Sequence, residues 1–201
     1  IYEVCDFKIM DMFSYTYHVE SFCVLKKKYR KATFNDINDI ANLVTDLLGT
    51  CNIKSESSIL ESNIEEITKD INHYYVCTIN DKIVGACGIS DILKQDRFNL
   101  GLKNIKEILY LVVDKKYQGK GIGTQLLKLC SNYNKEDIIY EAWGDNGEYV
   151  NSKFILEKCG YKMIKDLGKD YYRKQNYCNK CINKEKECYE CMAQIWIKFK
   201  I

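Results

Sequence analysis

The stretch that decides the fold is IKEILYLVVDKKYQGKGIG, residues 105–123. Its first half, residues 105–113, is strongly apolar and predicts a central β-strand. Its second half contains Gly119, Gly121 and Gly123, and apolar residues at helical spacing then predict a helix over about 121–133. The stretch therefore predicts a strand that passes through a glycine turn into an amphipathic helix.

This turn has the chemistry of an anion site. Glycines let the backbone approach a ligand closely, and the first N–H groups of a helix have no partner within the helix. Together with the helix dipole they suit a pyrophosphate, and Lys115, Lys116 and Lys120 add positive charge. The spacing is neither GxxxxGK[ST] nor GxGxxG, because Thr124 stands where the latter requires its third glycine.

The rest of the chain alternates between strand and helix patterns. Strands are predicted at 28–33, 73–79, 83–92, 138–143, 161–164 and 193–199, and helices at 37–48, 57–70 and 149–158. Thr33 followed by Asp36 resembles a capping box at the start of the first helix. No repeat or flexible linker interrupts the series, which predicts one domain.

The remaining spacing, Q-x-x-G-x-G at Gln118, Gly121 and Gly123, resembles the acyl-CoA motif of the GNAT superfamily of N-acetyltransferases. Residues 156–161, LEKCGY, and the order of predicted elements are similar to that family too. The resemblance implies an α+β fold, an α/β three-layer arrangement with a GNAT-like mixed central sheet and helices on both faces. It covers residues 29–201, and residues 1–28 are predicted to be an N-terminal extension.

The resemblance also implies acetyl-CoA as the co-substrate. Backbone groups of Leu111, Val112 and Val113 would pair with the pantetheine, and Asn151 on the penultimate helix would contact CoA. The amides that would hold the pyrophosphate belong to one continuous segment: Gln118, Gly119, Lys120, Gly121, Ile122, Gly123 and Thr124.

The implied reaction is direct attack of a primary amine on the thioester in a ternary complex. An amine with a pKa of about 10.4 must first lose a proton, and Glu107 is the predicted base. The alternative is that Glu107 is only a solvated residue at the start of the strand. The family's usual acid, a tyrosine, is replaced by Leu156. Tyr149, which is the predicted catalytic residue, or Tyr161 would take its place, unless the thiolate leaves unaided.

Four of the eleven cysteines form two CxxC pairs, at Cys178, Cys181, Cys188 and Cys191. Two such pairs can present four thiolates to one tetrahedral metal ion, which predicts a structural zinc knuckle over 178–191. Iron and four free thiols are the alternatives. The scattered remaining cysteines favour a reducing cytoplasm.

Composition narrows the function classes. A net charge of +2 argues against a nucleic-acid partner, and no apolar run is long enough for a membrane helix. Two other functions stay open: a regulatory module that binds acyl-CoA without turnover, and an adaptor built on the zinc knuckle. The acceptor remains a small-molecule or peptide amine, and the oligomeric state is open.

Overall fold

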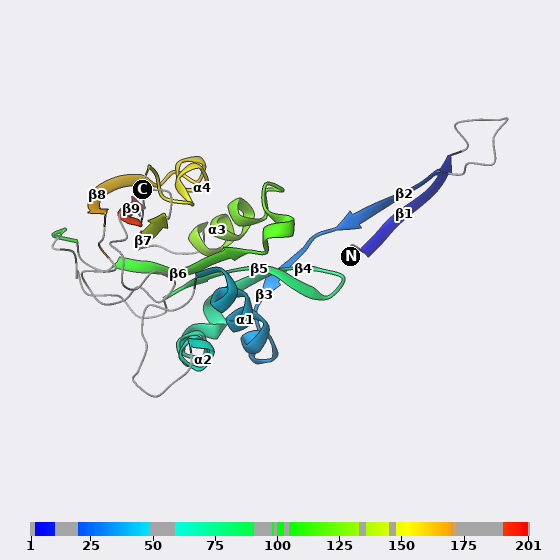
Figure 1. The fold of residues 1–201 in the computed structure, drawn as a ribbon, viewed down its shortest axis with the longest axis horizontal. Helices are drawn as coiled ribbons and strands as arrows, with labels where there is room; N and C mark the ends of the chain where they lie inside the picture. The colour runs from blue at the N-terminus through cyan, green and yellow to red at the C-terminus, as the bar shows by residue number, and fades with distance from the viewer. Residues whose placement is uncertain are drawn as a thin grey trace.

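The computed structural model describes residues 3–10, 20–48, 59–90, 98, 100–102, 105–132, 136–144, 148–169, 171 and 191–200, with 3–10 and 20–26 as backbone only. Strands β1 (Glu3–Met10) and β2 (Glu20–Lys26) pair antiparallel in a sheet of their own. This two-stranded arm extends away from the rest of the described chain (Figure 1). The boundary of an N-terminal extension at residue 28 stays a prediction.

The remaining described strands form one mixed sheet of seven strands. They are β3 (Lys28–Lys31), β4 (Tyr74–Ile79), β5 (Lys82–Ile89), β6 (Ile105–Val113), β7 (Asp137–Gly144), β8 (Lys162–Lys169) and β9 (Met192–Lys198). The spatial order is β3-β4-β5-β6-β7-β9-β8. Neighbours are antiparallel except β6 and β7, which run parallel.

Helices cover both faces of this sheet (Figure 1). Helices α1 (Ile37–Leu48) and α2 (Ile59–Asp70) pack against one face, where Ile40, Val44 and Ile67 are fully buried. Helices α3 (Ile122–Asn132) and α4 (Lys153–Lys158) cover the other, with Leu126 and Leu156 in its core. The predicted α+β fold with helices on both faces is confirmed.

The 3-10 turn over Phe34–Asp36, which leads directly into α1, begins with an acidic cap at Thr33. The carboxylate of Asp36 accepts hydrogen bonds from the Thr33 amide at 2.7 Å and the Thr33 hydroxyl at 2.9 Å. Both terminal nitrogens of Arg30, on β3, donate to the same carboxylate at 2.7 and 2.8 Å. These contacts hold the pKa of Asp36 at about 2, chiefly through the Arg30 guanidinium. The capping role predicted for Thr33 and Asp36 is confirmed.

Several predicted boundaries differ from the structure. His73 does not begin a strand but ends a 3-10 turn over Ile71–His73, and β8 extends to Lys169 instead of ending at residue 164. Helix α4 begins at Lys153, not at Tyr149. The reason lies in β7: the Asn151 amide donates to the Trp143 carbonyl at 2.9 Å, which holds the preceding backbone against the strand.

None of the helices in the described ranges is long and apolar enough to cross a bilayer.

Candidate functional site

The central feature of the site is the place where the two parallel strands part. Strands β6 and β7 are in register from Ile105 and Asp137 to Ile108 and Tyr140. Beyond that pair, β7 continues with β9 as far as Gly144, while β6 continues with β5 as far as Val113. The C-terminal half of β6 therefore has a β-strand partner on one edge only, among the strands described.

A β-bulge produces this divergence. Cys87 of β5 is opposite Leu111 and Ile89 is opposite Ile108, so two residues of β6, Leu109 and Tyr110, face one residue of β5. Such a bulge bends the strand and increases its twist. Both Leu109 and Tyr110 pack into the core under α1 and α2. The bulge thus turns β6 away from β7 directly after the Ile108–Tyr140 pair.

The register determines which backbone groups of β6 face the open edge. The Asp114 amide donates to the Val84 carbonyl at 2.9 Å, and antiparallel pairs alternate between bonded and non-bonded. Val112, opposite Ala86, therefore directs its N–H and C=O toward β5. Leu111 and Val113 direct theirs to the other edge. Of the three residues predicted to pair with pantetheine, these two have suitably placed backbone groups.

A tight turn connects β6 to α3. The Asp114 carboxylate accepts a hydrogen bond from the Lys116 amide at 2.9 Å and begins a 3-10 turn over Lys115–Tyr117. The side-chain amide of Gln118 donates to the Val113 carbonyl at 2.9 Å and ties the turn back to the strand.

Two glycines then set the direction of the chain. Gly119 and Gly121 have φ of 72° and 78°, in the left-handed region that side chains rarely adopt. The next three amides, of residues 122–124, belong to the first turn of α3 and have no acceptor within the helix, whose first bond runs from the Gln125 amide to the Gly121 carbonyl at 3.1 Å. The structure thus brings glycine backbone and a helix N-terminus together at the end of β6, as the sequence predicts. This arrangement favours a phosphate group.

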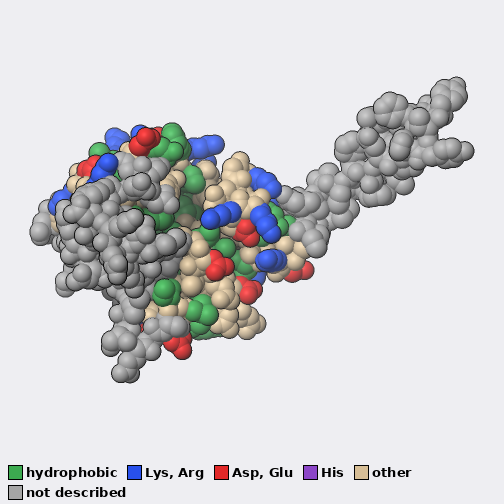
Figure 2. All heavy atoms as spheres, in the orientation of Figure 1, with side chains coloured by type: hydrophobic (Ala, Val, Ile, Leu, Met, Phe, Trp, Pro, Cys, Tyr) green, Lys and Arg blue, Asp and Glu red, His purple; other side chains and the backbone are tan. Residues whose placement is uncertain are grey.

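Lysines surround this turn. The Lys27 ammonium donates to the Lys120 carbonyl at 2.6 Å, and the Lys120 ammonium donates to the Lys116 carbonyl at 3.1 Å. The Lys120 ammonium also lies 5.1 Å from the centre of the Tyr117 ring. Figure 2 shows several lysine or arginine side chains on the same side of the molecule. The positive charge complements a polyphosphate.

Helix α4 approaches α3 closely beside the turn. A Cβ atom at Gly123 would lie 3.1 Å from the end of Ile155, so the glycine allows the two helices to meet. Tyr149 and Asn151 precede α4 and are exposed, and Tyr149 makes an edge-to-face contact with Phe154 at 5.8 Å. The prediction that both belong to a helix is wrong, but their roles toward CoA and catalysis stay predictions.

Glu107 lies on the face of the sheet opposite to α3 and α4. It is opposite Ile139 of β7 and only 6% exposed, and its backbone bonds to Ser90 in both directions. It is therefore not the solvated strand-end residue considered as the alternative. Glu141, two residues after Ile139, lies on the same face because strand residues alternate. Glu141 is not among the residues predicted from the sequence, although the alternation of strand residues along 138–143 indicates that it shares a face with Ile139.

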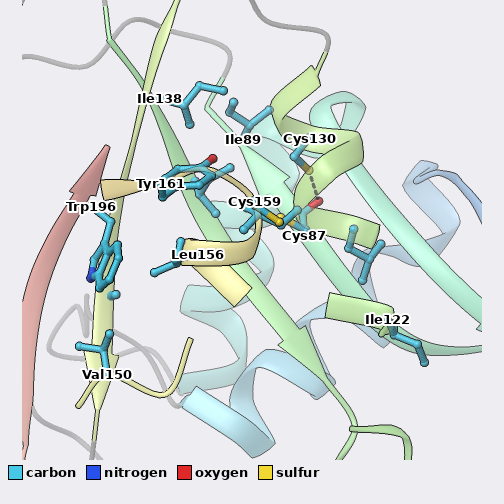
Figure 3. Close-up of a cluster of buried hydrophobic side chains, with 14 of the residues drawn as sticks. Cys87, Ile89, Ile122, Cys130, Ile138, Val150, Leu156, Cys159, Tyr161 and Trp196 are labelled. Atoms are coloured by element: carbon cyan, nitrogen blue, oxygen red, sulfur yellow. Dashed lines mark hydrogen bonds between the residues drawn. The ribbon is translucent and has the colours of Figure 1, made fainter. Parts of the chain in front are cut away.

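The tyrosine candidates differ in accessibility. Leu156 is fully buried in the core between α3, α4 and the sheet (Figure 3). Tyr161 lies in the same core, and its hydroxyl is 2.8 Å from that of Ser131. Burial raises the pKa of Tyr161 well above its usual range. Tyr161 is thus a core residue, and Tyr149 is the more accessible of the two.

Three of the four cysteines of the predicted knuckle lie outside the described residues: Cys178, Cys181 and Cys188. The fourth, Cys191, directly precedes β9. Within the described ranges, no three or more His, Cys, Asp or Glu side chains are grouped as a metal site.

Comparison with known families fits this geometry. The family model described as acetyltransferase (GNAT) domain matches residues 70–177, from the end of α2 to beyond β8. The chain belongs to the GNAT acetyltransferase family. The GNAT domain includes the parted strands, the glycine turn and α4.

A curated relative and two solved structures extend the comparison. The N-alpha-acetyltransferase RimI of Mycobacterium tuberculosis is 28% identical over 109 residues, which cover 54% of this chain and 63% of the relative. The loading GNATL domain of CurA from Lyngbya majuscula has a TM-score of 0.60 at 16% identity, covering 87% of this chain and 98% of that one. The NatC complex bound to Gag peptide and CoA contains a chain with the same TM-score and identity, covering 88% and 100%. Both structures support the GNAT fold.

Proposed function

We propose that this protein transfers the acetyl group of acetyl-CoA to a primary amine by direct attack in a ternary complex. The observation that carries the proposal is the parting of β6 and β7 next to a glycine turn and helix N-terminus. The open polar edge of β6 leads directly into the glycine turn. CoA has two matching parts, because its extended pantetheine would lie along the strand edge and its pyrophosphate would lie on the turn.

The coenzyme would lie along the open edge of β6. The amides of residues 118–124 would bind its pyrophosphate, and backbone groups of Leu111 and Val113 would pair with its pantetheine amides. From Val113 to Ile108 the strand spans about 16 Å at roughly 3.3 Å per residue. The thioester would then lie near the Ile108–Tyr140 pair, where the strands meet.

The acceptor would approach from the face that carries Glu107. Glu107 would take a proton from the ammonium, directly or through water, and the free amine would attack the thioester carbonyl. A backbone N–H of β6 would stabilise the oxyanion. Glu141 on the same face adds a second carboxylate, which favours a cationic acceptor. RimI is named an N-alpha-acetyltransferase, and the NatC complex is bound to Gag peptide and CoA, so a peptide α-amine is the acceptor class to test first.

The test has a binding arm and a turnover arm. We expect the full chain to bind CoA in calorimetry and to release free thiol from acetyl-CoA when an amine acceptor is supplied. Glu107→Gln should bind CoA as the unaltered protein does, while kcat/KM for the acceptor falls roughly 10²- to 10⁴-fold. Absence of CoA binding by the folded protein would overturn the assignment. Binding without turnover on any amine would instead support the regulatory module, which the apolar residue at 156 also favours.

We also propose that Cys178, Cys181, Cys188 and Cys191 hold a structural zinc ion. Lys169 of β8 is paired with Met192 of β9, so the two ends of the segment between the strands lie side by side. Four thiolates leave zinc no open position, so the ion would stabilise this segment and take no part in catalysis. Metal analysis should find about one zinc per chain, and less after Cys178→Ser. Full retention of metal by that variant would contradict the proposal.

A further inference from the structure

Tyr140 occupies the point where the parted strands meet. It is the last residue of β7 in register with β6, opposite Ile108. Its neighbours Ile139 and Glu141 lie on the opposite face of the sheet, where Ile139 belongs to a separate core cluster, so the Tyr140 ring lies on the face covered by α3 and α4. There it packs against the same core cluster as Leu156. The phenol thus extends from the meeting point of the strands toward the helices beside the glycine turn.

The hydroxyl of Tyr140 lies near the side chain of Ser152, at the start of α4, without a hydrogen bond between them. Ser152 lies one helical turn before Leu156, whose amide donates to the Ser152 carbonyl at 2.9 Å. Residues four apart share a helix face. The Tyr140 phenol therefore lies beside the face of α4 that carries Leu156, a residue that cannot donate a proton.

The surroundings keep this phenol in its protonated form. Burial raises the pKa of Tyr140 above its usual range, and the side chain of Ser152 offsets that effect only partly. The other titratable groups buried in this core are Cys77, Cys87, Cys130, Cys159 and Tyr161, and three tyrosines pack against it, Tyr29, Tyr75 and Tyr117. Burial also raises the pKa of Cys87, Cys159 and Tyr161, so these three stay neutral near pH 7. Tyr140 can therefore act as a hydrogen-bond donor throughout the neutral range.

We propose that Tyr140 donates its phenolic proton to the sulfur of departing CoA, and so replaces the acid that residue 156 does not supply. This inference rests on the proposed function. The amine nitrogen forms a bond to the acetyl carbonyl carbon, and the C–S bond breaks with its electron pair moving to sulfur. The sulfur takes the proton of Tyr140, and the phenolate regains a proton from water. The nitrogen loses two protons in all, one to Glu107 before the attack and one to water as the amide forms. One of them balances the proton delivered to the thiol, and the other is released to solvent.

Two matched Tyr→Phe variants of the full chain test this role. Tyr140→Phe should lower kcat roughly 10²-fold while KM for acetyl-CoA and the Kd for CoA stay the same. Tyr161→Phe, which removes a hydroxyl group from the same core, should keep kcat within about threefold. A Tyr140→Phe protein that folds and turns over at the normal rate would overturn the inference. If instead the unaltered chain neither binds CoA nor turns over, the proposed function itself fails.

A second measurement applies if Tyr140→Phe does not fold. Difluorotyrosine at position 140 keeps the shape of the ring but makes the phenol more acidic. A proton donor so altered should change kcat at neutral pH while the Kd for CoA stays the same, whereas a residue that only packs would leave both unchanged. An unchanged kcat would refute the inference even though the protein is folded.

Discussion

Gly121→Ala separates the role of the glycine turn in binding from its role in folding. At φ of 78°, an L-residue costs about 1–2 kcal/mol, partly offset by the lower entropy of the unfolded chain. A Cβ at Gly121 would meet nothing within 4 Å, so backbone strain is the main term and the net loss of stability should be about 1 kcal/mol. The added methyl group would, however, occupy the surface that the pyrophosphate approaches. Losing one charge-assisted hydrogen bond costs about 1.5–3 kcal/mol, which corresponds to a roughly 10- to 100-fold weaker Kd for CoA.

Gly168→Ala is the matched control. Gly168 lies on the edge strand β8 and has φ of 79°, and a Cβ atom added there would likewise meet nothing within 4 Å. Both variants should lose the same stability in thermal unfolding, a few degrees in Tm. Only Gly121→Ala should weaken CoA binding in calorimetry. Equal CoA affinity for the two variants would show that the pyrophosphate does not lie on this turn.

Three further variants test separate parts of the structure. Asp36→Asn should lower the free energy of unfolding at pH 7 by about 2 kcal/mol, because the pKa of Asp36 falls from 3.8 to about 2 on folding. This stability is present above pH ~4 and is lost as pH falls toward 2. The free energies of urea unfolding of variant and parent should therefore converge near pH 2. A difference that stays constant with pH would contradict the Arg30–Asp36 pairing. Glu141→Gln should raise KM for a cationic acceptor roughly fivefold, about 1 kcal/mol, with KM for acetyl-CoA unchanged; an equal rise for a neutral acceptor would speak against a charge contact. Leu156→Ala should cost about 2–5 kcal/mol by leaving a cavity, and a loss below 1 kcal/mol would be inconsistent with its complete burial.

The predictions that succeeded depend on local chemistry. The apolar run over residues 105–113 is β6 to the residue, and the glycines after it adopt the backbone that only glycine takes easily. Asp36 caps α1 through atoms three residues apart in the chain. Features of this kind follow from side-chain size, polarity and spacing within a few residues, so they can be read without knowing what packs against them.

Other features depend on contacts between distant segments. Tyr149 looks helical in sequence, yet the backbone from Tyr149 to Asn151 is held by β7, which delays α4 to Lys153. The parting of β6 and β7 requires a bulge whose register involves β5, and no pattern within β6 alone reveals it.

The sequence by itself determined the strand, the glycine turn and the helix that follows, because backbone preference and hydrophobic period act locally. Only the tertiary structure decided which groups meet there. It directed Leu111 and Val113 to the open edge, placed Glu107 and Glu141 on one face, and set Tyr140 at the point where the strands separate. Those assignments depend on strand register, in which a shift of one residue would exchange the two faces of the sheet.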